Sequence, residues 1–235
     1  TYEGRHILNK EIKACLKQNR RISDKDSELL IRESKIMSDV HHYSLPAFRD
    51  LIKVDDGSYV LIMSFVEGKT LDKIIEKHKA LHPEEVSWIT NRTLGALYYL
   101  HKKGIIHGDI KPSNIIIQPK DHNAVLIDYG LSVFQPTSTT KAAGYTEVFS
   151  APEITQGTPP VRASDFYSLG LTMIYAMGGD PIAKSYPDYV PKPLQEFCNS
   201  LIRYHPTDRT SWDKEDLGAR LSDVRLEAFG RRHSH

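Results

Sequence analysis

Residues 107–114 read His-Gly-Asp-Ile-Lys-Pro-Ser-Asn, and residues 128–130 read Asp-Tyr-Gly. Between these two stretches lie two short apolar runs, at 115–117 and 124–127, joined by a polar turn over 119–123. Two such runs around a turn predict a β-hairpin. A hairpin brings its two ends together, so four polar side chains that flank it are expected to be neighbours: Asp109, Lys111, Asn114 and Asp128.

These four side chains supply what phosphoryl transfer needs. Oxygen atoms of Asp and Asn are the hard ligands that suit Mg²⁺. A carboxylate can orient an attacking hydroxyl group and accept its proton, and a lysine can balance charge on the transferring group. The pattern therefore indicates phosphoryl transfer from a nucleotide with Mg²⁺ or Mn²⁺.

The same stretch resembles two motifs of eukaryotic-type Ser/Thr protein kinases, the catalytic loop His-Arg-Asp-x-Lys-x-x-Asn and the metal-binding Asp-Phe-Gly. The resemblance implies that Asp109 is the catalytic base and that Asn114 and Asp128 bind the metal ion. It also implies that Lys111 is the lysine expected in this loop of Ser/Thr kinases rather than Tyr kinases. ATP and a protein substrate are the partners that follow.

Two residues depart from the family's pattern. Gly108 replaces the arginine that normally pairs with a phosphorylated activation loop, and Tyr129 replaces Phe. Without that arginine, activity is expected to depend little on phosphorylation of the activation loop. The run Thr137–Thr140 is expected to be a polar loop, with a regulatory phosphorylation site as the alternative.

Further motifs follow in the order that the resemblance requires. Ala151-Pro152-Glu153 closes the segment that begins at Asp128, and Thr146 is positioned to bond the catalytic Asp and Lys. Asp165 resembles the buried aspartate that anchors the catalytic loop, and Arg209 resembles the buried partner of Glu153. The resemblance thus covers nearly the whole chain.

A strand lysine that holds the nucleotide phosphates is also expected from the resemblance. Residues 12–17 alternate in polarity, which predicts a half-buried strand with one inward face formed by Ile12, Ala14 and Leu16. This alternation favours Lys17 as the phosphate-binding lysine. Lys13 is the alternative, but it would place Glu11 where the adenine requires a small apolar residue.

The partner expected for this lysine is Glu33, on a helix that should run to about Met37. Ser23 followed by Asp26 resembles a capping box at the start of that helix. Glu33 lies on the same helix face as Leu29 and Met37, and a carboxylate on an apolar face needs a partner.

The resemblance also outlines an adenine pocket. Met63 is the expected gatekeeper, and Ser64, Phe65 and Val66 form the hinge whose backbone bonds the base. Cys15 forms the roof of the pocket and Ile116 its floor. The glycine-rich loop is not found; Tyr2-Glu-Gly-Arg-His resembles the strand after it, so that loop would precede residue 1.

The expected fold is α+β, with the two lobes of a protein kinase: a strand-rich N-lobe over 1–67 and a larger helical C-lobe over 68–235. In the C-lobe, Pro83-Glu-Glu begins a helix that Lys102-Lys-Gly104 ends. Residues 163–178 are apolar nearly all round, which predicts a core helix.

The composition bears on the partners and the location that can be expected for this protein. Lys and Arg total 31 against 30 acidic residues, so no net field points to nucleic acid or an anionic membrane. Cys15 and Cys198 are too few for a disulfide framework, which favours a cytoplasmic location. No apolar run approaches a membrane span, and no signal peptide is recognisable. A monomer is compatible with all of this.

Three functions compete at this stage. The first is an active Ser/Thr protein kinase, and the second is a pseudokinase that binds partners without turnover. The third is a small-molecule phosphotransferase of the aminoglycoside or choline kinase type. Retention of Asp109, Lys111, Asn114 and Asp128 favours an enzyme, while the missing glycine loop favours the pseudokinase. The Ala-Pro-Glu motif and Lys111 disfavour the small-molecule enzyme.

Overall fold

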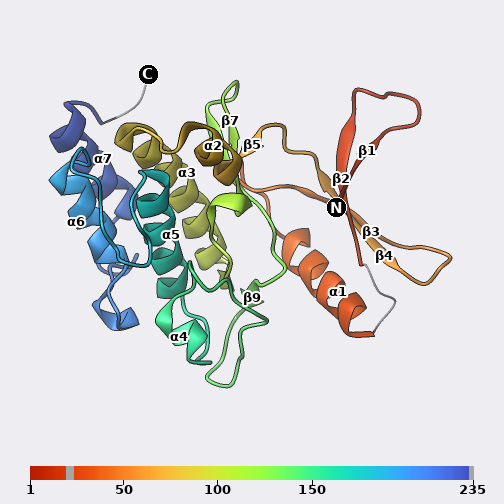
Figure 1. The fold of residues 1–235 in the computed structure, drawn as a ribbon. Helices are drawn as coiled ribbons and strands as arrows, with labels where there is room; N and C mark the ends of the chain where they lie inside the picture. The colour runs from red at the N-terminus through yellow and green to blue at the C-terminus, as the bar shows by residue number, and fades with distance from the viewer. Residues whose placement is uncertain (20–23, 233–235) are drawn as a thin grey trace.

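A computed structural model describes residues 1–19 and 24–232. The first part is a four-stranded antiparallel sheet in the order β1-β2-β4-β3, with helix α1 beside it (Figure 1). Its elements are β1 (Tyr2–Arg5), β2 (Lys13–Gln18), α1 (Asp24–Ser38), β3 (Phe48–Lys53) and β4 (Tyr59–Ser64).

The second part is mainly helical. It begins at the short strand β5 and includes two small sheets, β5-β7-β8 and β6-β9. Its strands are β5 (Lys69–Thr70), β6 (Ile105–Ile106), β7 (Ile115–Gln118), β8 (Asn123–Leu126) and β9 (Val133–Phe134). Its α-helices are α2 (Leu71–His78), α3 (Pro83–Lys102), α4 (Pro152–Thr155), α5 (Arg162–Ala176), α6 (Lys192–Leu201) and α7 (Leu217–Phe229). Two 3₁₀ turns complete it, η1 (Pro112–Asn114) and η2 (Pro206–Asp208).

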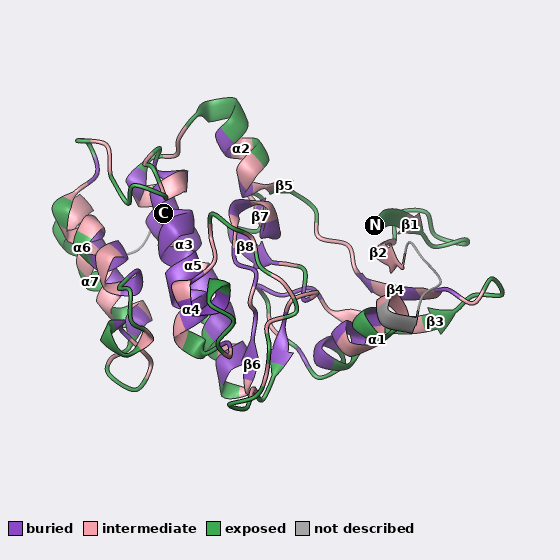
Figure 2. Cartoon of the chain, turned by 60° about the horizontal axis from the view of Figure 1, so that its bottom comes forward, coloured by how far each residue is buried: buried purple, intermediate pink, exposed green. Residues whose placement is uncertain are grey.

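Helices α3 and α5 form the centre of the helical part, where buried purple dominates in Figure 2. Every residue from 164 to 174 is buried, as the all-round apolar pattern of that segment predicts. Helix α3 begins with a capping box, in which the His82 side chain accepts from the Glu84 amide and the Glu85 carboxylate accepts from the His82 amide. The strand-rich first part and helical second part agree with the expected α+β fold.

The start of β2 differs from the sequence expectation. Ile12, which alternation places on the inward face, is 55% exposed, because it lies in the connection before β2. Ala14 and Leu16 are only half-buried, and the opposite face, with Cys15 and Lys17, lines the cleft between the two parts. Alternation therefore identified the strand, but the inward face was wrong.

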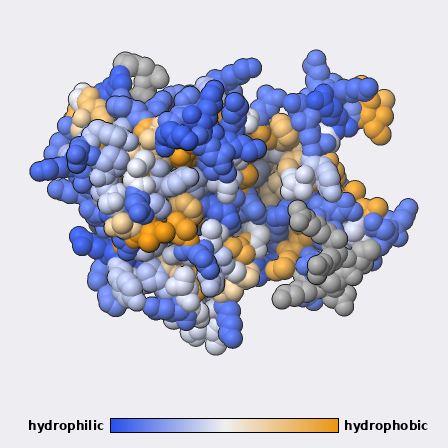
Figure 3. All heavy atoms as spheres, viewed as in Figure 1, coloured by the Kyte–Doolittle hydropathy of each residue, from blue (hydrophilic) through white to orange (hydrophobic). Residues whose placement is uncertain are grey.

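The proposed capping role of Ser23 lies outside the described residues. Ile7 and Leu8, 90% and 91% exposed, make an apolar tip between β1 and β2, which carries the hydrophobic colour at the upper right of Figure 3. Within residues 1–19 and 24–232, none of the helices combines the length and apolar character that a membrane span requires.

Candidate active site

The β7–β8 hairpin brings together the four polar residues that flank it, as its sequence predicts. Strand β7 pairs with β8 from Ile115↔Leu126 to Gln118↔Asn123, so the residues before β7 and after β8 meet at one end. The Ile127 amide also donates to the Asn114 carbonyl, at 2.9 Å. This pairing brings the 107–114 loop and Asp128 to the same side of the cleft.

The Asp109 carboxylate receives three hydrogen-bond donors. Thr146 Oγ1 donates to its Oδ1 at 2.8 Å, while Asn114 Nδ2 and Lys111 Nζ reach its Oδ2 at 2.9 and 2.8 Å. Lys111 Nζ also donates to Thr146 Oγ1 at 3.0 Å. The sequence expectation that Thr146 contacts both the Asp and the Lys agrees with this geometry. Charge-assisted bonds of this kind hold a carboxylate in one orientation.

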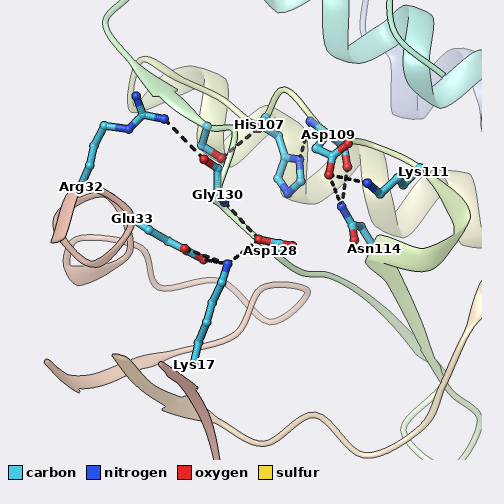
Figure 4. A network of polar contacts seen from close by, with 10 residues as sticks. Lys17, Arg32, Glu33, His107, Asp109, Lys111, Asn114, Asp128 and Gly130 are labelled. Carbon is cyan, nitrogen blue, oxygen red and sulfur yellow. Dashed lines mark hydrogen bonds and ion pairs between the residues drawn. The ribbon is translucent and has the colours of Figure 1, made fainter. Parts of the chain in front are cut away.

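Lys17, rather than Lys13, reaches the catalytic side of the cleft. Its Nζ lies 2.8 Å from both Glu33 Oε2 and Asp128 Oδ1 (Figure 4). Lys13 Nζ instead lies 3.1 Å from Glu67 Oε1, at the surface. Lys17 thus joins β2, α1 and the segment after β8 through one cation.

Opposing effects set the charges of this trio. Burial acts to lower the pKa of Lys17, but the Glu33 and Asp128 carboxylates outweigh it and raise that pKa. Burial tends to raise the pKa of Asp128, but the Lys17 ammonium group and the Gly130 amide outweigh it and lower that pKa. Lys17 therefore stays cationic and Asp128 anionic near neutral pH. Burial dominates at Glu33 and raises its pKa despite the contact with Lys17.

A cavity of about 250 Å³ lies between the strand-rich and the helical part. Its lining includes all nine residues expected to bind the nucleotide: Cys15, Lys17, Glu33, Met63, Ser64, Phe65, Val66, Ile116 and Asp128. Thr1, Pro46, Ile127 and Tyr129 also line it. A wider cavity of about 740 Å³ continues from it past Asp109, Lys111 and Thr146. The cleft therefore has a narrower, mostly apolar end and a wider end that carries the charged side chains.

The backbone is unusual at two positions of the site. Asp128 has φ of 69°, in the left-handed region that non-glycine residues seldom adopt. The Gly130 amide donates to Asp128 Oδ1 at 3.1 Å and helps to hold this conformation. Gly108 has φ of 79°, and a Cβ there would lie 2.8 Å from the Leu131 carbonyl oxygen. Glycine at 108 is thus matched to its backbone, a fact that the sequence alone does not reveal.

Asp165 anchors the loop from helix α5. Its carboxylate accepts the backbone amides of His107 and Gly108, at 2.9 and 2.8 Å. The geometry agrees with the anchoring role that the resemblance implies. Sequence reasoning missed two residues of the site. His101 Nε2 lies 2.8 Å from Asp165 Oδ2, and Arg32 Nη2 donates to the Gly130 carbonyl, next to Asp128, at 3.4 Å. For Arg32, the available signal was its place beside Glu33.

Arg209 and Glu153 form a buried ion pair, as expected. Arg209 Nη1 and Nη2 donate to the two Glu153 oxygens at 2.6 and 2.8 Å, and Arg209 is 0% exposed. Ser164 Oγ donates to Glu153 as well, at 2.7 Å. This pair fastens the end of the 128–153 segment to the helical core.

Tyr129 buries a hydroxyl group that has no hydrogen-bond partner within the described part of the chain. Burial raises the pKa of this phenol, so it stays neutral. An unsatisfied buried hydroxyl costs about 1–3 kcal/mol. We therefore expect Tyr129→Phe to raise the melting temperature by roughly 2–4 °C for each kcal/mol recovered. Thermal unfolding followed by circular dichroism tests this; an unchanged or lower melting temperature would show that the hydroxyl is satisfied in solution.

Fold and site together define a two-part domain with a cleft, lined by paired carboxylates and lysines, between a strand-rich and a helical part. A family model described as the protein kinase domain matches residues 1–215, and the chain belongs to this family. It is 32% identical over 213 residues to the serine/threonine-protein kinase PknA of Nostoc sp., covering 80% of this chain and 37% of that protein. It is 34% identical over 200 residues to PrkC of Bacillus subtilis, covering 82% of this chain and 30% of that kinase. The chain thus spans about a third of the length of these curated relatives.

Proposed function

We propose that this chain is the catalytic domain of a Ser/Thr protein kinase, which transfers the γ-phosphate of ATP to a protein hydroxyl group. One observation carries the proposal: Lys17 contacts Asp128, and both residues line the same cleft as Asp109. In this proposal residues 1–67 and 68–235 are the two lobes. The names of the relatives, which describe serine/threonine-protein kinases, support the same activity.

The adenine is proposed to occupy the cavity of about 250 Å³, between Cys15 and Ile116. Met63 limits its depth, and the backbone of residues 64–66 offers hydrogen bonds along one edge. Lys17 then holds the α- and β-phosphates, with Glu33 fixing the direction of its ammonium group.

The donor set fits a divalent cation shared with the phosphates. Asn114 uses its Nδ2 to donate to Asp109, which leaves its amide oxygen as the ligand, and Asp128 supplies a carboxylate. The described residues contain no group of three or more His, Cys, Asp or Glu that could hold a metal by itself. This suits Mg²⁺, which proteins commonly bind through one or two side chains and the substrate phosphates. When bound, the cation neutralises charge on the triphosphate.

Asp109 is proposed as the base. It accepts the proton of the Ser or Thr hydroxyl as the hydroxyl oxygen forms a bond to the γ-phosphorus and the bond from that phosphorus to the β-bridging oxygen breaks, releasing ADP. Lys111, 2.8 Å from Asp109, balances charge on the transferring group. Thr146 keeps the carboxylate aimed into the cleft.

The test is phosphate transfer from labelled ATP to a general protein substrate, with two matched lysine variants. Lys17→Met is expected to lower transfer by about 10²-fold or more, because it removes the cation from the phosphates. Lys13→Met, on the same strand, is expected to retain activity, since the Lys13 ammonium group pairs with Glu3 and Glu67, lies over the Phe65 ring, and does not line the phosphate end of the cleft. Loss in Lys13→Met alone would reverse the assignment of the two lysines. No transfer by the unmodified chain, even when extended upstream of Thr1, would favour the pseudokinase.

Gly108 leads to a separate expectation about regulation. Since Gly108 carries no cationic side chain, phosphate on the 128–153 segment gains no partner at that position. Phosphatase treatment should therefore leave the specific activity within about twofold of the untreated protein. A comparison of the two samples, with phosphate content checked by mass spectrometry, decides the matter. Abolished activity would mean that another basic group reads the phosphate.

The cytoplasmic location, the monomeric state and the lack of a nucleic-acid partner, all expected from the sequence, stay predictions. Small-molecule phosphotransfer is a further outcome of the same assay, detected when an aminoglycoside or choline replaces the protein substrate.

A further inference from the structure

We propose that Trp212 is a positioning residue for the catalytic loop, acting through His101 and Asp165. Trp212 donates to His101 Nδ1 and so holds the imidazole with its Nε2 toward Asp165, and Asp165 holds the backbone beside Asp109. The kinetic part of this inference rests on the proposed function, while its structural part does not.

The hydrogen bonds define the direction of the chain of contacts. Trp212 Nε1 lies 2.9 Å from His101 Nδ1, and an indole nitrogen can only donate. His101 Nδ1 is therefore an acceptor, so the ring proton of a neutral imidazole is on Nε2. That Nε2 lies 2.8 Å from Asp165 Oδ2, within reach to donate to the carboxylate.

Asp165 carries the effect to the loop. Its Oδ2 accepts the His107 amide as well as the imidazole, and its Oδ1 accepts the Gly108 amide. The side chains of His101 and Asp165 are both 1% exposed, so no water shell replaces a lost contact. The two amides belong to the residues immediately before Asp109. The orientation of this backbone therefore sets the position from which the Asp109 side chain extends.

Trp212 is well placed to act as a support. It lies in the connection between η2 and α7, far in sequence from the loop that it serves. Its ring packs edge-on against Phe166 and Tyr98, with ring centres 5.1 and 5.3 Å away. Trp212 is half-buried and borders two cavities, of about 840 and 430 Å³. A smaller aromatic ring can therefore replace it without a steric clash.

Two tryptophan variants separate the hydrogen bond from the packing. Trp212→Phe keeps an aromatic ring but removes the donor to His101. Trp88→Phe is the matched control, because Trp88 is half-buried on the same helix as His101 and its indole N–H has no partner among the described residues. Imidazole nitrogen shifts measured by NMR report the tautomer of His101, and amide hydrogen exchange reports the bonds from His107 and Gly108 to Asp165.

In the unmodified protein and in Trp88→Phe, His101 should carry its proton on Nε2 and both amides should be protected. In Trp212→Phe we expect the Nδ1 shift to move, because that nitrogen loses its donor, and exchange of the two amides to be about five- to tenfold faster, as for one lost hydrogen bond. The kcat should fall by a similar factor, with the KM for ATP unchanged, because Trp212 does not line the nucleotide pocket.

Several results would overturn the inference. One is a Trp212→Phe protein that keeps the Nδ1 shift and the amide protection of the unmodified protein, or a Trp88→Phe protein that loses both. Should Trp212→Phe fail to fold, the unmodified protein decides: a scalar coupling across the Trp212–His101 hydrogen bond must be present, and its absence rejects the proposal. If the unmodified chain transfers no phosphate, the proposed function fails, while the tautomer and exchange measurements still judge this inference.

Discussion

Asp109→Asn is expected to lower kcat for phosphate transfer by about 10²- to 10⁴-fold, the usual loss when a general base is removed. The amide cannot take the proton of the incoming hydroxyl group. It would also present an NH₂ group toward Asn114 Nδ2 and Lys111 Nζ, both of which donate to the carboxylate in the unmodified protein. The variant side chain thus cannot accept the proton and loses hydrogen bonds that orient the carboxylate in the unmodified protein.

Nucleotide binding should survive this change, since Asp109 does not line the cavity of about 250 Å³. The dissociation constant for ATP, measured by calorimetry, is expected to stay within about threefold, a change of less than 1 kcal/mol. Thr146→Val provides a matched comparison, because it removes a donor to Asp109 but leaves the carboxylate. It should lose about tenfold in kcat, far less than Asp109→Asn. Near-normal turnover by Asp109→Asn would exclude Asp109 as the base.

The second large effect concerns stability. Glu153→Gln is expected to lower the free energy of unfolding by about 3–5 kcal/mol, because it leaves the buried Arg209 without a counter-charge. Urea unfolding at pH 7 measures this loss. The double variant Glu153→Leu/Arg209→Met removes both charges and should recover part of the stability. Full recovery is not expected, because Arg209 also donates to the carbonyls of Arg203, Ala163 and Tyr204.

The same pair predicts a dependence on pH. Burial tends to raise the pKa of Glu153, but hydrogen bonds from Arg209 and Ser164 lower it below the ordinary value of 4.5. A carboxylate whose pKa is lower in the folded state contributes stability above its unfolded pKa and loses that contribution as the pH falls through the folded value. The unmodified protein should therefore lose stability below about pH 4.5, and the acid limb should be shallower in Glu153→Gln. Parallel acid limbs for the two proteins would contradict this.

Much of the site followed from local sequence. The spacing of apolar runs around 119–123 predicted the β7–β8 hairpin, and that hairpin brings the loop with Asp109 and Asn114 close to Asp128. The apolar residues on nearly every side of segment 163–178 likewise predicted a buried helix. These predictions succeed because hydrogen bonding and burial within a short stretch decide them, whatever the rest of the chain does.

Tertiary structure decided the contacts between distant elements. Lys13 and Lys17 both lie on β2, and only the placement of α1 and Asp128 gives Lys17 its two carboxylates. The left-handed backbone of Gly108 depends on the nearby Leu131 carbonyl, and His101 gains its role from Trp212, 111 residues away. Sequence determines which side chains are available and the periodicity of each element, but the meeting of charges across the cleft depends on packing that no local pattern encodes.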